Sequence, residues 1–190
     1  MAKPAVFFAA LLRGPAAKKL DQALTTSGLV KKPGSLGWPA GNRHQALSDL
    51  QAHPLDLPRL LKAGANVRAA PLTLRLEHIE GRGRDGVTHW ELRPEKTPAL
   101  ECLLDAIRLS LVQQGLPEGA ARNAPCITLS QRAPYRLEQP VRLQQPIEWR
   151  IDQFQLVRST GHGVTYHYEE LGRWALDGEL GPDAPQMALP

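Results

Sequence analysis

The sequence predicts an α+β fold built on antiparallel sheets. Runs in which apolar and polar residues alternate outnumber the stretches with helical spacing, and two of these runs flank a glycine-rich turn. The chain of 190 residues also contains 17 prolines and 16 glycines, which indicate many turns. A chain of this length forms one or at most two compact domains with a substantial core.

The first predicted element is a buried strand at residues 5–12, AVFFAALL, all of which are apolar. A lysine precedes this run, so the run also has the outline of a short signal-peptide core. The apolar stretch ends at Arg13, however, and a helical stripe follows at once at residues 15–29. This order favours a buried strand followed by a helix.

The middle of the chain predicts a short strand, a short helix and a hairpin. A Gly/Pro-rich segment leads to RHQALSDL at 43–50, and a short helical segment flanked by prolines ends near Gly64. Residues 72–80 (LTLRLEHIE) and 87–94 (VTHWELRP) alternate on either side of the turn GRGRDG. Two alternating runs around such a turn are typical of a β-hairpin.

The second half begins with the clearest helix, at 98–114. Its leucines and an isoleucine recur at helical spacing, Pro98 suits the start, and Gly115 suits the stop. Further strands are predicted at 126–132, at 147–159 with a bulge after Ile151 because the alternation shifts phase there, and at 164–176.

The composition and the absence of certain motifs exclude several classes of protein. Two distant cysteines suggest neither a disulfide framework nor a metal site, so we expect a reducing, cytoplasmic environment. No apolar stretch approaches the roughly 20 residues that span a bilayer, and we expect no membrane association. The net charge of +4 fits a ligand that carries phosphates, although many soluble proteins are equally basic. Neither a phosphate-cradling glycine loop nor a HExxH or paired CxxC motif is present, so we expect no metal and no cofactor.

Two short alternating segments, NRHQALSDL around His44 and APCITLSQR around Cys126, form a pair of similar patterns. In each, positions i and i+2 share a strand face: His44 with Ala46, and Cys126 with Thr128. A strand rises about 3.3 Å per residue, so such neighbours project about 6–7 Å apart. This gap suits a phosphate held between a basic group and a hydroxyl. Each of the six histidines taken singly is more typical of a surface or strand residue.

Together with these segments, the ends of the chain carry a family resemblance. The opening VFFAALL, the order of elements over 72–114 and the closing YEELGRWAL at 168–176 resemble the RNA 2′,3′-cyclic phosphodiesterases, also called 2′-5′ RNA ligases, of the two-histidine phosphoesterase superfamily. The resemblance implies a bilobal, pseudo-symmetric pair of antiparallel sheets flanked by helices, with a central cleft. It covers one domain at 1–176 and leaves a loose Pro/Gly-rich tail at 177–190.

Both His-x-Thr/Ser motifs of that family are degenerate in this chain. The first reads His-Gln-Ala from His44 to Ala46, so the histidine is present and the hydroxyl is missing. The second reads Cys-Ile-Thr from Cys126 to Thr128, so the hydroxyl is present and the histidine is missing. A glutamine takes the place of the arginine that usually follows the second motif, and Arg132 comes one residue later.

The resemblance implies a cyclic phosphodiesterase that acts on RNA termini or nucleotides with a terminal or cyclic phosphate, as a monomer and without a metal. In the family, one imidazole takes a proton from water and the other protonates the departing ribose oxygen, which suits a group with a pKa of about 6.5. Losing one such group typically costs about 10²- to 10⁴-fold in rate, so we expect weak activity. The candidate catalytic residues are His44 and Cys126, and the candidate substrate-binding residues are Thr128, Arg132, Tyr168 and Trp90.

Several alternatives stay open. A thiol with a pKa of about 8.5 is mostly protonated at pH 7 and would act as an acid; a thiolate nucleophile is less favoured, because no phosphate loop of the cysteine-phosphatase kind is present. Cys126 is otherwise a small half-buried residue, and His44 a solvent-facing strand histidine. His162 or His167 would supply a replacement imidazole if either reached the cleft. The second function class is a non-catalytic protein that binds RNA ends or nucleotides in the family cleft, with ring stacking from Trp90 or Tyr168.

Overall fold

The computed structural model describes residues 5–31, 36, 39–49, 56–84, 87–117, 126–160 and 167–178. The predicted α+β class is confirmed: three α-helices accompany eight strands within these ranges. The helices are α1 (Gly14–Thr26), α2 (Leu57–Asn66) and α3 (Pro98–Gln113). The strands are β1 (Val6–Leu11), β2 (His44–Ala46), β3 (Leu72–Arg84), β4 (Val87–Pro94), β5 (Ile127–Ser130), β6 (Val141–Ile151), β7 (Gln153–Thr160) and β8 (His167–Ala175).

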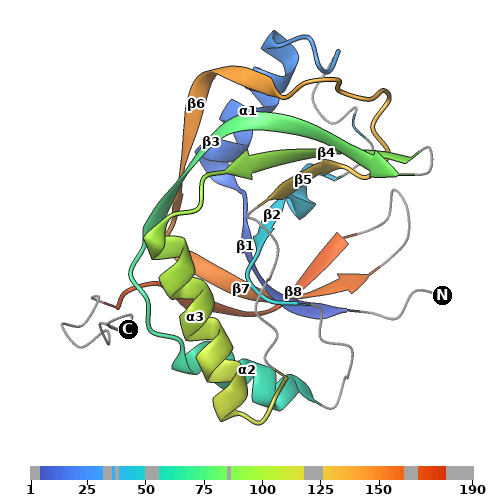
Figure 1. The fold of residues 1–190 in the computed structure, drawn as a ribbon. Helices are drawn as coiled ribbons and strands as arrows, with labels where there is room; N and C mark the ends of the chain where they lie inside the picture. The colour runs from blue at the N-terminus through green and yellow to red at the C-terminus, as the bar shows by residue number, and fades with distance from the viewer. Residues whose placement is uncertain are drawn as a thin grey trace, which may run out of the picture.

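The strands form one antiparallel sheet in the order β6-β3-β4-β5-β2-β1-β7-β8. Two four-stranded halves, β6-β3-β4-β5 and β2-β1-β7-β8, are therefore joined through β5 and β2, where Gln45 pairs with Ile127. The expected pair of sheets is in this respect one sheet with two halves. Figure 1 shows β3, β4 and β5 above β7 and β8, with the two halves diverging toward the right of the view.

The helices pack on one face of this sheet. α1 lies against β6, while α2 contacts α3, β7 and β8. The large apolar cluster on this face includes Phe8, Trp90 and Phe154, all with an exposed fraction of 0%. A second, smaller cluster lies on the other face: Phe7, Ala9, Leu11 and Val157, with Tyr168 packed against it. β1 thus contributes buried side chains to both faces, which confirms the buried first strand.

The prediction of a single bulged strand at 147–159 is wrong. β6 ends at Ile151 and β7 begins at Gln153. β6 pairs with β3 at the edge of one half, whereas β7 pairs with β1 and β8 in the other half. The phase shift in the sequence marks the place where the chain crosses between the halves. The first part of β6 was not predicted because Pro146 interrupts its sequence pattern. An edge strand such as β6 tolerates a proline.

The remaining expectations concern local elements. The hairpin of β3 and β4 and the helix α3 are confirmed, and Thr97 Oγ1 accepts a hydrogen bond of 3.2 Å from the Leu100 N–H at the start of α3. Of the expected tail at 177–190 only residues 177 and 178 are described, and the Gly178 N–H donates to the Ala69 carbonyl at 3.2 Å. Among the described helices, none is long and apolar enough to cross a membrane.

Candidate functional site

The four motif positions lie together on one face of the β2–β5 pair. Gln45 is directly opposite Ile127, and both side chains are buried. Because successive strand residues point to opposite faces, the residues on either side of this pair point the other way. The antiparallel register then places His44 beside Thr128 and Ala46 beside Cys126, with about 4.5–5.5 Å between opposite Cα atoms. His44 and Cys126 are diagonal neighbours, on the order of 7–8 Å apart.

This register arranges the four motif positions in space in a way that the sequence does not reveal. His44 and Thr128 are cross-strand neighbours, although they come from different sequence segments. Ala46 and Cys126 are neighbours as well. The site therefore has one end with an imidazole and a hydroxyl, and another end with a methyl group and a thiol.

His44 is held in a defined tautomer. Its Nδ1 lies 2.8 Å from the Asn42 carbonyl oxygen, which only accepts hydrogen bonds, so Nδ1 carries the hydrogen and Nε2 is the acceptor in the neutral ring. The ring lies 5.2 Å from the Phe7 ring and 5.0 Å from the Tyr168 ring, measured between centroids. Burial lowers the pKa of His44 and outweighs the bond to Asn42, which raises it. Near neutral pH this imidazole is a neutral base.

Cys126 is half-buried and its thiol is free. Burial raises the pKa of this thiol, and the nearby Glu91 raises it further, while Arg93 and Arg82 lower it. At neutral pH the side chain is a protonated thiol. Since a nucleophile or a general base must be deprotonated, the raised pKa favours proton donation by Cys126 over attack or proton acceptance.

A cluster of charged side chains on the β3–β4 hairpin borders the site. Glu91 is opposite Thr128, and Leu92 is opposite Ile127, so Arg93 is the next neighbour of Cys126. Arg93 Nη2 donates to Glu91 Oε2 at 2.6 Å, and its Nε lies 3.0 Å from Glu80 Oε2. Arg82 lies near the same two glutamates at 3.7 and 3.8 Å. Sequence reasoning missed these four residues. Their alternation within the hairpin indicates a shared face, but nothing local indicates that β4 pairs with β5.

Tyr168 lies on the site face of β8. It is opposite Ser159 and meets the Phe7 ring edge-on at 5.3 Å between centroids. Arg132 is exposed just beyond β5, and its backbone N–H donates to Ser130 Oγ at 3.3 Å. Within the described residues no hydrogen bond or ion pair ties its guanidinium to Thr128.

The predicted stacking role of Trp90 is wrong. Its side chain is completely buried in the core on the helix-covered face, since it alternates with Glu91 on β4. Its indole N–H donates to the Tyr135 carbonyl oxygen at 3.0 Å. Trp90 therefore anchors the segment after β5 and offers no surface to a ligand.

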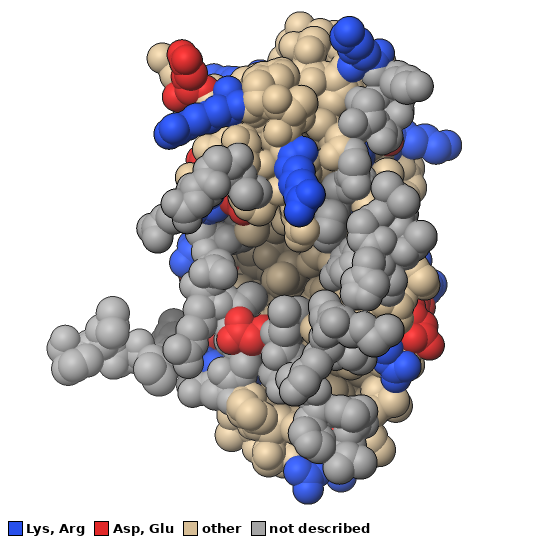
Figure 2. Space-filling model, turned by 90° about the vertical axis from the view of Figure 1, so that its right-hand side faces the viewer, with Lys and Arg blue, Asp and Glu red and all other residues tan. Residues whose placement is uncertain are grey.

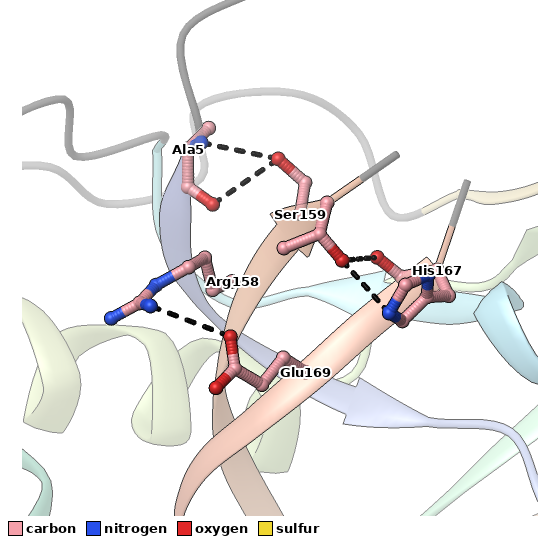
Figure 3. A network of polar contacts seen from close by, with 6 residues as sticks. Ala5, Arg158, Ser159, His167 and Glu169 are labelled. Atoms are coloured by element: carbon pink, nitrogen blue, oxygen red, sulfur yellow. Dashed lines mark hydrogen bonds and ion pairs between the residues drawn. The ribbon is translucent and has the colours of Figure 1, made fainter. Parts of the chain in front are cut away.

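His167 does not supply the missing imidazole. It precedes Tyr168 on β8 and so points to the opposite face, where its Nε2 lies 2.9 Å from Thr160 Oγ1 (Figure 3). The same figure shows Ser159 bonded to the backbone of Ala5 and the ion pair between Arg158 and Glu169. These contacts tie β7 to β8 and to Ala5, on the face away from His44 or at the end of the sheet. His162 lies outside the described residues.

Figure 2 looks at the side toward which the two halves diverge and shows a hollow near its middle, with uncharged residues at its visible floor. A separate cavity of about 340 Å³ lies between α1 and β6 and contains none of the motif residues. Its lining residues are Lys19, Gln22, Ala23, Thr26, Gln144, Gln145, Pro146 and Ile147. In the described part of the chain, no three His, Cys, Asp or Glu side chains gather in a way that could hold a metal ion.

Comparison with known proteins identifies the architecture. No family model matches the chain, and no curated protein matches it. Several solved structures do. TT0787 of Thermus thermophilus has a TM-score of 0.70 and 23% identity over 92% of this chain and 99% of its own. E. coli LigT complexed with NADP⁺ has a TM-score of 0.67 and 22% identity over 90% of this chain and 97% of its own. A phosphoesterase has a TM-score of 0.68 and 22% identity over 92% of this chain and 99% of its own.

These similarities define the class of fold. Nearly the whole of each structure is covered, so the chain has the same fold as LigT. The fold expected from the sequence resemblance is thereby confirmed.

Proposed function

We propose that this protein is an RNA 2′,3′-cyclic phosphodiesterase-like (2′-5′ RNA ligase-like) protein that binds RNA termini or nucleotides by their phosphate and hydrolyses cyclic phosphates slowly. The observation that carries the proposal is the cross-strand pair of His44 and Thr128 on the open face of a LigT-type sheet. Both positions match the motif residues of the family that the sequence resembles. The E. coli LigT structures with 3′-AMP, ATP and phosphate support a nucleotide as the ligand.

The proposed reaction uses the intact end of the site. His44 Nε2 takes a proton from a water molecule whose oxygen attacks the phosphorus, while the Thr128 hydroxyl donates to a non-bridging oxygen. The bond from phosphorus to one ribose oxygen breaks, and that oxygen needs a proton. The Cys126 thiol is the nearest group of the motif that can donate one, and it is shorter than an imidazole and a weaker donor. Slow hydrolysis follows.

The apolar half of the open face suits the rest of a nucleotide. Phe7, Leu11 and Val157 are buried there, and the half-buried Tyr168 packs against them. A base that stacks on the Tyr168 ring gains about 1–3 kcal/mol without a sequence preference. With the base on this side, the phosphate lies between His44 and Thr128.

A time course on an oligonucleotide that ends in a 2′,3′-cyclic phosphate tests the proposal. We expect slow hydrolysis by the natural protein and none by His44→Ala, because the proposed general base is gone. His167→Ala is the matched control, since this histidine points to the other face, and it retains the natural rate. Identical purification of all three excludes a contaminating nuclease. No hydrolysis by the natural protein refutes the enzymatic proposal.

The second candidate is a binding protein without turnover. Ala46 and the raised pKa of Cys126 favour it, because these two motif positions supply neither a hydroxyl nor a group that titrates near pH 7. Calorimetry with phosphorylated ribonucleotides distinguishes the two: binding that weakens in Thr128→Ala, without product, supports the binder. No binding of any phosphorylated ribonucleotide at low salt excludes both candidates.

A further inference from the structure

The guanidinium of Arg93 lies next to the end of the site that Ala46 and Cys126 form. Arg93 is the β4 neighbour of Cys126 in the register that pairs Leu92 with Ile127. Its side chain has an exposed fraction of only 16%, whereas that of Arg82 is 58%. Of the two arginines in the cluster, Arg93 is the one enclosed next to the motif residues.

Glu91 of the same strand and Glu80 of the neighbouring strand β3 hold the Arg93 guanidinium. Glu91 accepts the bond of 2.6 Å from Nη2, and Glu80 lies 3.0 Å from Nε. The Nε–H is not directed at Glu80, so this buried nitrogen has an ion-pair partner but no hydrogen bond within the described residues. The position of the guanidinium is therefore restricted, while only its Nη2 donates a hydrogen bond within the described residues. A planar fork of donors held in this way suits a phosphate better than an ammonium group does.

We propose that Arg93 binds the phosphate of the ligand at the end of the site where Ala46 and Cys126 provide no anion contact, with Glu91 and Glu80 as its positioning residues. This role rests on the proposed function. In this role Arg93 supplies a permanent charge where the family motifs have a hydroxyl and an imidazole. Such a charge strengthens the binding of phosphate but transfers no proton. The phosphate then contacts Thr128 of the central strand β5, with His44 of β2 on one side of it and Arg93 of β4 on the other.

The experiment compares the affinity of adenosine 3′-monophosphate and of adenosine by calorimetry at low salt. Arg93→Gln weakens the binding of the nucleotide about 10- to 100-fold, as expected for one charge-assisted hydrogen-bonded contact, and leaves the affinity for adenosine unchanged. Arg82→Gln removes the same charge from the exposed side of the same cluster and weakens binding no more than about threefold. An effect of Arg93→Gln no larger than that of Arg82→Gln overturns the inference.

Two further variants keep the outcome decisive. Arg93→Lys retains the charge but not the fork, and it lowers the affinity for the nucleotide severalfold; if Arg93→Gln does not fold, an unchanged affinity in Arg93→Lys overturns the inference. Thr128→Ala separates the two proposals. Loss of binding in Thr128→Ala with full binding in Arg93→Gln removes only the role of Arg93. A natural protein that does not bind the nucleotide removes both.

Discussion

Gln45 of β2 lies directly opposite Ile127 of β5, and among the described residues this is the pair that joins the two halves of the sheet. Both side chains are buried, so the residues that flank them project together from the other face. As a result His44 and Thr128 are neighbours, and so are Ala46 and Cys126. The imidazole and the hydroxyl of the candidate site therefore lie at one end of it, and the methyl group and the thiol lie at the other end.

The two cysteines should differ in reactivity. Burial and Glu91 raise the pKa of Cys126, whereas Cys102 is exposed on α3. Alkylation by iodoacetamide requires the thiolate, so at pH 8 we expect Cys126 to react at least severalfold more slowly than Cys102. Mass spectrometry of Cys102→Ser and Cys126→Ser, each with one remaining thiol, measures both rates. A faster reaction at Cys126 would show an activated thiolate and would revive the nucleophile hypothesis.

His44 should make the protein less stable in mild acid. Burial lowers its pKa in the folded protein, so the unfolded chain, with a pKa of about 6.5, binds a proton more readily. The free energy of unfolding therefore falls as the pH drops below about 6.5 and continues to fall until the lower folded pKa is passed. Urea unfolding at several pH values measures this slope, and His44→Gln should reduce it. A His44 ring that titrates above 6.5 by NMR would contradict the prediction.

Gly64 should resist replacement. A Cβ at this position of α2 would lie 2.5 Å from the Trp174 ring on β8, and that ring stacks on Phe154 at 5.4 Å between centroids. Alanine normally stabilises a helix interior by about 1 kcal/mol relative to glycine. Here overpacking should instead destabilise the protein by about 1–3 kcal/mol in thermal or urea unfolding. Gly41→Ala is the control, because nothing lies within 4 Å of its Cβ position, and it should change stability little.

The elements with strong local patterns could be predicted from the sequence. The apolar run of β1 and the helical spacing of α3 each carry their own signal, and the orientation of Trp90 was also readable, because Trp90 and Leu92 alternate with charged residues. The β2–β5 pairing carries no comparable signal. β2 has three residues, and within the described ranges it meets β5, a strand far away in the chain, through the pair Gln45–Ile127. The neighbours of His44 and Cys126 therefore emerge only from the assembled sheet.

The position of the charged hairpin residues beside the site could not be predicted for the same reason. Glu91 and Arg93 look like the solvated face of an ordinary hairpin when β3 and β4 are considered alone. Their place beside Thr128 and Cys126 depends on the pairing of β4 with β5. Side-chain alternation predicts which residues share a face, but the order of strands decides which faces form a site.

Introducing the second histidine and the second threonine of the family motifs should raise the rate of the proposed hydrolysis. Cys126→His returns the second imidazole and Ala46→Thr returns the second hydroxyl, at two positions that are cross-strand neighbours. The imidazole alone should raise hydrolysis of a 2′,3′-cyclic phosphate about 10²-fold or more, because it protonates the departing ribose oxygen. Ala46→Thr alone should raise it less, since it adds a phosphate contact without a proton donor. The rates of the natural protein, both single variants and the double variant are measured on one cyclic-phosphate oligonucleotide.

The rate increase in the double variant should exceed the product of the increases in the two single variants. The reason is that the new threonine orients the phosphate whose leaving oxygen the new imidazole protonates. Replacing His44 by alanine in the double variant should abolish the gain, as expected if the activity uses both ends of the site. The prediction fails if Cys126→His hydrolyses the oligonucleotide more slowly than the natural protein does, since the cysteine would then be a selected catalytic group. If all four proteins are inactive while 3′-AMP still binds, the site holds phosphate without turnover, and the binding protein is the function that remains.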